Sequence, residues 1–156
     1  MNRVNAIKKI INDNQGSIII ISNGLSSREA NYFLDNKRLF YMLHAMGESL
    51  SVGMGMIHAN KKIKVVVIDG DYNAIMGSSS WHLLPNYKNL KYYILNNNIS
   101  QTTGSQKIPK PLVPLKLKNY IKIIKIFGKK LKTPNPDNPK SIKKKIQDWF
   151  KKNNII

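Results

Sequence analysis

Two short runs of consecutive apolar residues constrain the fold of this chain more than any other feature. Residues 17–21 read SIIII, and residues 64–68 read KVVVI. Runs of this length, rich in isoleucine and valine, are typical of strands that are covered on both faces, as in parallel sheets. Helical patterns lie between such runs. The sequence therefore predicts an α/β fold of three layers, in which helices cover both faces of a parallel sheet.

The other elements follow from the same periodicities. Apolar residues at helical spacing predict a first helix over 3–14, with Val4, Ile7 and Ile10 on one face. Further helices are expected at 26–34, 46–58, 74–84 and 141–152, and further strands at 38–43, 90–95 and 120–127. The 156 residues fit a single domain, in which 98–119 form a long loop and 133–156 a basic C-terminal linker and helix.

Prolines and glycines set two finer expectations. The helix at 74–84 should end before Pro85, because proline disrupts a helix interior. In the helix at 46–58, Gly47, Ser51 and Gly55 recur at every fourth position. They form a smooth face, which is expected to pack closely on the sheet or on a ligand.

Charge and composition narrow the function classes. Lysine and arginine number 26 and aspartate and glutamate number 8, which gives a formal net charge of +18. No helix-turn-helix, zinc-finger or RNP-like pattern accompanies this charge, so nucleic-acid binding is not favoured. A positive field that attracts an anionic cofactor, an anionic substrate or an acidic partner is the simpler interpretation. The absence of cysteine excludes disulfides and thiolate metal sites.

Two further observations concern the cellular location. The N-terminal segment is amphipathic and does not have the continuous apolar core of a secretory signal. The apolar runs are also much too short to span a bilayer. We therefore expect a cytoplasmic protein that does not insert into a membrane.

Polar side chains follow two of the predicted strands. The strand at 64–68 runs into Asp69, Gly70 and Asp71, and the strand at 90–95 runs into three asparagines that include Asn97. Asp71 and Asn97 are 26 positions apart, about the length of one helix and one strand. If the strands are neighbours, a carboxylate and a carboxamide meet at one sheet edge, where Mg²⁺ and a phosphate group could bind. Either signal alone is more often an ordinary turn.

The segment from 22 to 106 resembles the C-terminal domain of the phosphonopyruvate and sulfopyruvate decarboxylases, which depend on thiamine diphosphate. The matching pieces are, in order, SNGLSSREA, FYMLHAMGESLSVGMGM, KVVVIDGDYNAIMGSSSWHLLPNYKNLKYYILNNN and QTTGSQ. The tail PNPDNPKSIKKKIQDWF is similar to the closing helix of that family. The resemblance implies a thiamine-diphosphate-binding fold and a single diphosphate-binding domain over 1–156, in which the 98–119 loop covers the cofactor.

The resemblance also implies roles for particular residues. Mg²⁺ would be bound by the side chains of Asp71 and Asn97 and by the carbonyl of Ile99. The diphosphate would be surrounded by Gly70, Asp71, Tyr72 and Asn73. Met46 would bend the cofactor into its reactive shape, and the His44 carbonyl would accept a hydrogen bond from the aminopyrimidine. The loop that orders over the cofactor would contain Thr102, Thr103, Gly104 and Gln106.

Several residues depart from the family pattern. Tyr72 and His44 stand where glycine is usual in the family, and Asn96, Asn98 and Ser105 replace the usual Asp, Gly and Gly. The predicted metal ligands are unaffected. Tyr72 and His44 favour an alternative in which the chain is a non-catalytic or regulatory subunit that kept the fold.

The chain has two glutamates, Glu29 and Glu48, and neither lies in a motif like that of the activating glutamate of the family. We therefore expect a partner chain, an alpha subunit with a pyrimidine-binding domain, to supply that residue. The assembly would contain two copies of each chain or more. The expected reaction is decarboxylation of an anionic three-carbon 2-oxo acid such as sulfopyruvate or phosphonopyruvate, with a related carboligase as an alternative. Arg28, near the start of a helix, either packs at the helix terminus or helps to hold an acidic substrate or the partner chain.

Overall fold

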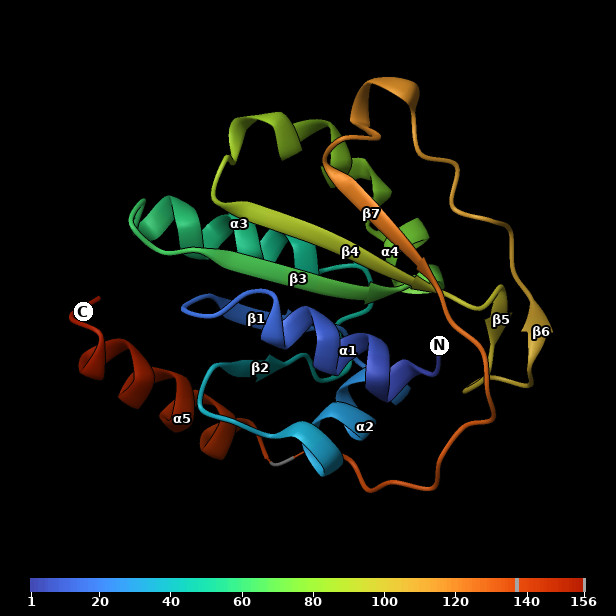
Figure 1. Ribbon diagram of the computed structural model, residues 1–156, viewed down its shortest axis with the longest axis horizontal. Coiled ribbons are helices and arrows are strands. Elements are labelled where there is room, and N and C mark those ends of the chain that lie inside the picture. Colours follow the sequence, from blue (N-terminus) through green and yellow to red (C-terminus); the bar gives the residue numbers. More distant parts are fainter. Residues whose placement is uncertain (137, 156) are drawn as a thin grey trace.

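The computed structural model describes residues 1–136 and 138–155, and in this part of the chain five parallel strands form a sheet in the order β2-β1-β3-β4-β7 (Figure 1). The strands are Ile18–Ile21 (β1), Leu39–Tyr41 (β2), Val65–Gly70 (β3), Leu90–Asn96 (β4) and Ile121–Lys125 (β7). The predicted parallel α/β fold is confirmed.

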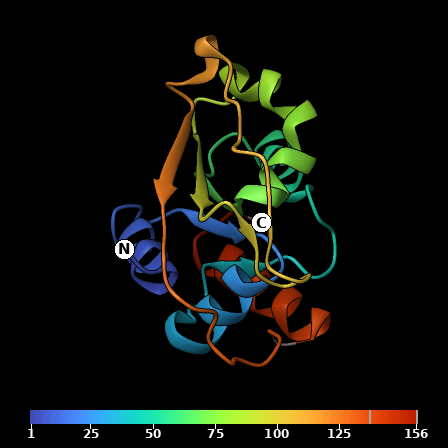
Figure 2. The same cartoon turned by 90° about the vertical axis from the view of Figure 1, so that its right-hand side faces the viewer.

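Helices cover both faces of this sheet (Figures 1 and 2). Side chains of α1 and α2 belong to the apolar core on one face, and those of α3, α4 and the following 3-10 helix η1 belong to the core on the other. The last helix, α5, lies beside the edge strand β2 and contacts both cores. The bounds are Arg3–Asn12 (α1), Leu25–Leu34 (α2), Ser49–Ala59 (α3), Asp71–Met76 (α4), Ser78–Asn86 (η1) and Pro139–Lys152 (α5).

The apolar runs fill both cores because side chains alternate along a strand. In β1, Ile18 and Ile20 pack toward α3, while Ile19 and Ile21 pack toward α1. All four are fully buried. Complete burial of one such side chain contributes roughly 1.5 to 3 kcal/mol. A strand of consecutive isoleucines is therefore stable only where both faces are covered, as they are here.

The predicted helix at 74–84 is wrong in its bounds. Helix α4 begins at Asp71 and ends at Met76, and η1 continues the chain to Asn86 with Pro85 inside it. The break falls at Gly77, where an added side chain would collide with the carbonyl of Gly47. Two segments far apart in the sequence thus approach at the backbone, which the local periodicity of 74–84 could not reveal.

The predicted helix at 46–58 also begins later, at Ser49. Gly47 has a φ of 82°, in the left-handed region that interrupts a helix and favours glycine. Gly53, and not Gly55, packs closely on the sheet: a Cβ at Gly53 would lie 2.8 Å from a methyl carbon of Val67, whereas one at Gly55 would meet nothing within 4 Å. The predicted small-residue face is therefore wrong.

The loop over 98–119 contains short elements that the sequence did not predict. Ile99–Ser100 (β5) and Gln106–Lys107 (β6) form an antiparallel hairpin, and Leu115–Leu117 is a 3-10 turn, η2. In the C-terminal segment, Asn138 caps α5 by accepting a hydrogen bond from the Ser141 N–H at 3.0 Å. Asp137 and Ile156 of the predicted 133–156 segment lie outside the described residues. No helix in the described part of the chain is long and apolar enough to cross a membrane.

A buried carboxylate fixes the end of β3. Asp69 is 1% exposed and accepts hydrogen bonds from the Ser49 hydroxyl, at the start of α3, and from the Tyr92 hydroxyl of β4 at 2.7 Å. Burial raises the pKa of Asp69 to about 6, and the hydrogen bonds from Ser49, Tyr92 and Ser22 oppose that rise. Asp69 thus joins a helix and a neighbouring strand immediately before the residues of the predicted site.

The raised pKa predicts that Asp69 contributes a pH dependence to stability. Between roughly pH 4 and pH 6 the folded protein keeps a proton on Asp69 that the unfolded chain releases, so this contribution to stability falls as pH rises. The difference in unfolding free energy between the wild type and Asp69→Asn should decrease by about 3 kcal/mol across that window. Urea unfolding at several pH values measures this difference, and a constant difference would contradict the prediction.

Candidate functional site

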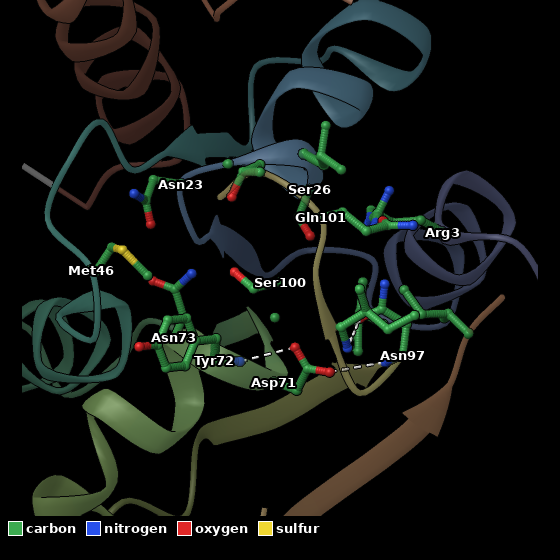
Figure 3. Close-up of a pocket in the computed structure, with 17 residues that line it drawn as sticks. Arg3, Asn23, Ser26, Met46, Asp71, Tyr72, Asn73, Asn97, Ser100 and Gln101 are labelled. Atoms are coloured by element: carbon green, nitrogen blue, oxygen red, sulfur yellow. Dashed lines mark hydrogen bonds between the residues drawn. The ribbon is translucent and has the colours of Figure 1, made fainter. Parts of the chain in front are cut away.

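An open pocket of about 500 Å³ lies where the chain leaves the carboxyl ends of β1, β3 and β4 (Figure 3). Crevices at this end of a parallel sheet are the usual ligand sites of such folds. Most of the residues that the sequence pointed to line this pocket together: Met46, Gly70, Asp71, Tyr72, Asn73, Asn97, Ile99 and Thr102.

Asp71 is the centre of the hydrogen bonding in this pocket. Its side chain is buried, and its Oδ2 accepts hydrogen bonds from the backbone N–H of Asn97 at 3.0 Å and of Asn98 at 2.7 Å. Its Oδ1 accepts from the N–H of Tyr72 at 2.9 Å. These bonds are possible because β3 and β4 are parallel neighbours, in register from Val65 and Leu90 to Gly70 and Leu95.

The Asn97 carboxamide lies against two oxygen atoms. If the carboxamide oxygen faces inward, it lies 3.0 Å from the carbonyl oxygen of Ile99 and 3.2 Å from Oδ2 of Asp71. If the carboxamide nitrogen faces inward, it donates a hydrogen bond to each of these two oxygens. Adjacent oxygens around Mg²⁺ lie about 3.0 Å apart, since Mg–O distances are about 2.1 Å in octahedral geometry. The two distances from the Asn97 carboxamide therefore leave room for a small divalent cation if its oxygen faces inward.

Opposing effects act on the ionisation of the Asp71 carboxyl group. Burial raises its pKa, while hydrogen bonds from Asn98, Asn97 and Tyr72 and the charge of Arg3 oppose the rise. Within the described residues, no group of three or more His, Cys, Asp or Glu side chains could hold a metal ion. A cation in this pocket would thus be held by one carboxylate and neutral oxygens, a set that leaves room for phosphate oxygens.

Space for an anion lies beside these oxygens. Gly70 precedes α4, and a Cβ added there would meet no atom within 4 Å, so the backbone is open to a ligand. The Oδ1 of Asn23 is buried, and no donor from the described residues reaches it. Both features fit a polar group in the pocket that this chain does not itself provide.

Asn73 and Met46 are coupled through the backbone. The Oδ1 of Asn73 accepts a hydrogen bond from the Gly47 N–H at 3.2 Å. The left-handed Gly47 and its close approach to Gly77 fix the turn that carries Met46 to the pocket wall. Asn73 therefore lines the pocket, as predicted, and also supports the turn that carries Met46, which the sequence did not predict.

The structure does not bring all predicted residues to this pocket. His44 lines an adjoining pocket together with Arg28, and Thr102 lines both pockets. The others lie in the exposed part of the β5–β6 hairpin, Thr103 and Gly104 at its tip and Gln106 in β6. The Thr103 hydroxyl is 2.7 Å from the Ser100 hydroxyl and accepts a hydrogen bond from the Gln106 amide at 2.8 Å. These residues hold the hairpin together and do not line the pocket in this conformation.

The backbone explains three departures from the family pattern. His44, Asn98 and Ser105 have φ values of 68°, 57° and 59°, in the left-handed region that glycine adopts without steric cost. Glycine, the usual residue at these positions in the family that the sequence resembles, suits this conformation. Asn98 is also held by Asn96, whose side-chain oxygen accepts the Asn98 N–H at 3.0 Å. The three side chains are thus carried by a backbone conformation that favours glycine.

Sequence reasoning missed several residues of the pocket wall, namely Arg3, Asn23, Ser26, Ser100 and Gln101. Asn23 and Ser26 follow β1, so the rule that polar residues after parallel strands gather at one edge could have found them. Arg3 precedes the first strand by a whole helix, and no local pattern indicates that its side chain reaches the same edge.

Comparison with known proteins identifies the family. A family model described as thiamine pyrophosphate enzyme, C-terminal TPP binding domain, matches residues 7–156. The chain is similar to sulfopyruvate decarboxylase subunit beta of Methanocaldococcus jannaschii, at 41% identity over 109 residues, which cover 67% of this chain and 57% of the relative. It is 33% identical over 109 residues to the phosphonopyruvate decarboxylase of Streptomyces hygroscopicus, covering 67% of this chain and 27% of the relative. The match thus spans only part of each relative.

A solved structure gives an independent comparison of the fold. The 2-oxoglutarate:ferredoxin oxidoreductase of Magnetococcus marinus matches with a TM-score of 0.52 and 23% identity, over 88% of this chain and 45% of that chain. At this identity the likeness concerns the fold alone, and it agrees with the predicted α/β fold. The resemblance found from the sequence motifs is confirmed. The chain belongs to the thiamine pyrophosphate enzyme family and matches its C-terminal TPP-binding domain.

Proposed function

We propose that this chain is the diphosphate- and Mg²⁺-binding subunit of a thiamine-diphosphate-dependent 2-oxo-acid decarboxylase. The main support is the meeting of Asp71, Asn97 and Ile99 at one edge of the sheet, where the inner end of the Asn97 carboxamide lies 3.2 Å from Oδ2 of Asp71 and 3.0 Å from the Ile99 carbonyl oxygen. The relatives at 33–41% identity are named decarboxylases, but the match covers 57% or less of their length. The reaction therefore stands as a proposal for this chain.

Each part of the pocket has a task in this proposal. Asp71, Asn97 and the Ile99 carbonyl would hold Mg²⁺, and Gly70, Tyr72 and Asn73 would surround the diphosphate. Met46 would support the bent cofactor from below, and the His44 carbonyl, which now accepts a hydrogen bond from the Asn23 amide at 3.4 Å, would receive the aminopyrimidine. The 98–119 loop would cover the cofactor. When bound, thiamine diphosphate supplies the electron sink that decarboxylation of a 2-oxo acid requires.

The two glutamates of the chain support a partner-supplied activating group. Glu29 is 2% exposed and accepts a hydrogen bond from Arg3 at 2.7 Å in an ion pair, so it is not free to serve a cofactor. Glu48 is exposed at the start of α3 and does not line the pocket of Asp71. A pyrimidine-binding alpha subunit would supply the missing glutamate, in an assembly with two copies of each chain or more.

The adjoining pocket supports an anionic substrate. Arg28 and His44 line it together, and Asn23, Gly24 and Thr102 connect it to the pocket of Asp71. A cationic side chain in a pocket that adjoins the proposed cofactor site would favour a three-carbon 2-oxo acid with a second acidic group, such as sulfopyruvate or phosphonopyruvate.

Removal of the Asp71 carboxylate should abolish cofactor binding that depends on Mg²⁺. In Asp71→Asn, calorimetry with thiamine diphosphate and Mg²⁺ is expected to show a loss of affinity of at least ~100-fold, because even outer-shell changes at metal sites cost 10 to 100-fold. Asp13→Asn, which changes an exposed aspartate of a surface ion pair, is the matched control. Unchanged binding by Asp71→Asn would remove this residue from the site.

Decarboxylation should require the partner chain. The purified chain is expected to show negligible turnover of sulfopyruvate and phosphonopyruvate, and addition of the pyrimidine-binding chain should restore it. In that complex Glu48→Gln should remain active, since Glu48 is exposed and away from the pocket. Robust turnover by the chain alone would overturn the split-site proposal.

Loss of Arg28 should affect only substrates with a second acidic group. In the complex, Arg28→Met is expected to raise the KM for sulfopyruvate roughly tenfold, the size of one lost hydrogen bond to a charged group, and to leave kcat nearly constant. Pyruvate, which has no second acidic group, serves as the control substrate. An equal effect on both substrates would indicate that Arg28 acts through helix packing.

Tyr72 favours the second candidate function, a non-catalytic subunit. Its side chain is 38% exposed at the start of α4, where the diphosphate would approach. If the wild-type chain, with its partner, does not bind thiamine diphosphate and Mg²⁺ but Tyr72→Gly does, this second function is correct. Binding by the wild type would exclude it.

A further inference from the structure

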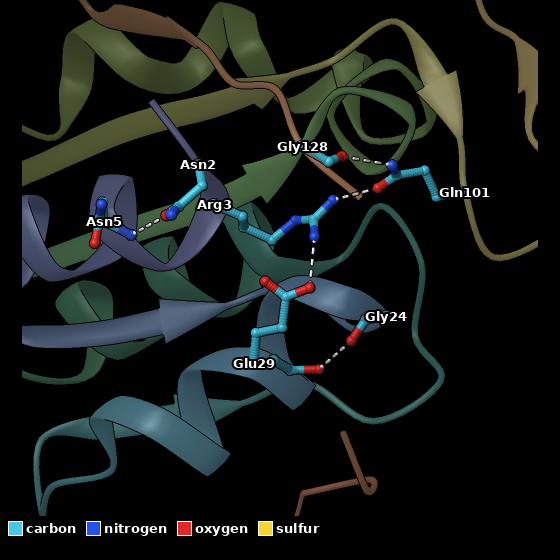
Figure 4. A network of polar contacts seen from close by, with 8 residues as sticks. Asn2, Arg3, Asn5, Gly24, Glu29, Gln101 and Gly128 are labelled. Carbon is cyan, nitrogen blue, oxygen red and sulfur yellow. Dashed lines mark hydrogen bonds and ion pairs between the residues drawn. The ribbon is translucent and has the colours of Figure 1, made fainter. Parts of the chain in front are cut away.

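A partly buried arginine, Arg3, connects the start of the chain to the loop after β4 (Figure 4). The guanidinium of Arg3 donates one hydrogen bond to Oε1 of Glu29 and another to Oε1 of Gln101, both at 2.7 Å. The side chains of Arg3 and Glu29 are only 11% and 2% exposed. Helices α1 and α2 and the loop are thus joined at one point beside the pocket of Asp71, whose wall includes both Arg3 and Gln101.

Gln101 extends this network to a further segment. Its side-chain amide donates to the carbonyl of Gly128 at 3.2 Å, and the neighbouring Phe127 N–H donates to the carbonyl of Met1 at 3.1 Å. The chain start, the loop after β4 and the segment after β7 are therefore linked in a ring of contacts. Gln101 is two positions from Ile99, whose carbonyl oxygen faces Asn97.

Beyond the bonds from the Asn97 and Asn98 N–H groups to Asp71, most hydrogen bonds of this loop are made within the loop itself. The β5–β6 hairpin pairs only Ile99 with Lys107 and Ser100 with Gln106, and residues 102–107 are exposed. A guanidinium can hold two acceptors at once in a fixed fork, whereas the lysine ammonium is a flexible point charge. Because Glu29 accepts a hydrogen bond from one guanidinium nitrogen of Arg3, the other nitrogen is oriented toward Gln101.

We infer that Arg3 is a positioning residue that acts through Gln101 to hold the segment from Asn97 to Thr102 at the pocket. The inference rests on the proposed function, because that segment carries the Asn97 side chain and the Ile99 carbonyl, two of the proposed Mg²⁺ ligands. Arg3 itself touches neither of these ligands through any hydrogen bond among the described residues.

Two single variants and their combination test this inference. Arg3→Lys keeps a cation for Glu29 but loses the second guanidinium nitrogen, which donates to Gln101. Gln101→Leu removes the side-chain oxygen that accepts this bond and leaves the Arg3–Glu29 pair intact. Hydrogen exchange of the ligand-free full chain reports on the backbone N–H groups of Asn98, Ser105 and Ile108, which donate within the loop or to Asp71. Each single variant should exchange these amides roughly tenfold faster than the wild type, as for the loss of one hydrogen bond to a charged group.

The combined variant distinguishes positioning from a general packing role. If Arg3 acts through Gln101, Arg3→Lys/Gln101→Leu should be no faster in exchange than Gln101→Leu alone. Additive effects, or unchanged exchange in Gln101→Leu, would overturn the inference. Lys9→Met, in the exposed ion pair on the same helix, is the matched control and should not change the loop.

Cofactor binding completes the test. Gln101→Leu should weaken the binding of Mg²⁺ with thiamine diphosphate roughly tenfold, with little change in the melting temperature. Should Arg3→Lys fail to fold, Arg3→Met/Glu29→Met replaces the ion pair with apolar side chains and should loosen the loop equally. Absence of binding by the wild type would refute the proposed function, while the exchange rates alone decide whether Arg3 holds the loop.

Discussion

The bonds from the Asn97 and Asn98 N–H groups to the Asp71 carboxylate are the interaction on which the site depends. They cross from the loop after β4 to the first residue of α4, and they place one carboxylate beside the Asn97 amide and the Ile99 carbonyl. A carboxylate buried in this way is costly unless hydrogen bonds or a cation compensate it. The N–H groups provide part of that compensation, and a divalent cation would provide the rest.

Two other buried contacts keep this edge of the sheet rigid. Asp69 ties the end of β3 to Ser49 and Tyr92, so the strand delivers Asp71 at a fixed position. Asn73 and the close approach of Gly47 to Gly77 fix the turn that carries Met46. In contrast, the outer residues of the loop after β4, 102–107, are exposed. The position of this loop therefore depends more strongly on the hydrogen bond between Arg3 and Gln101.

Residues close in sequence to a strand end were predictable, and residues brought in from elsewhere were not. Asp71 and Asn97 follow buried strands directly, so a rule about parallel sheets located them together. His44 and Thr103 were assigned through a family resemblance, which identifies positions but not whether the loop lies open or closed. The bounds of α4 depended on Gly77 meeting Gly47, a long-range contact that no periodicity within 71–86 contains.

The sequence by itself determined the layers, because runs such as SIIII can be stable only between two covered faces. The pieces from SNGLSSREA to QTTGSQ indicated the family, and the polar residues after two strands pointed to the edge of the sheet where the candidate site lies. Only the tertiary structure decided which strands are neighbours, how Arg3 and Glu29 meet across two helices, and which predicted residues line the pocket. The physical reason is that periodicity reports the face that a residue buries, whereas a pocket is formed by segments that meet only after the sheet has assembled.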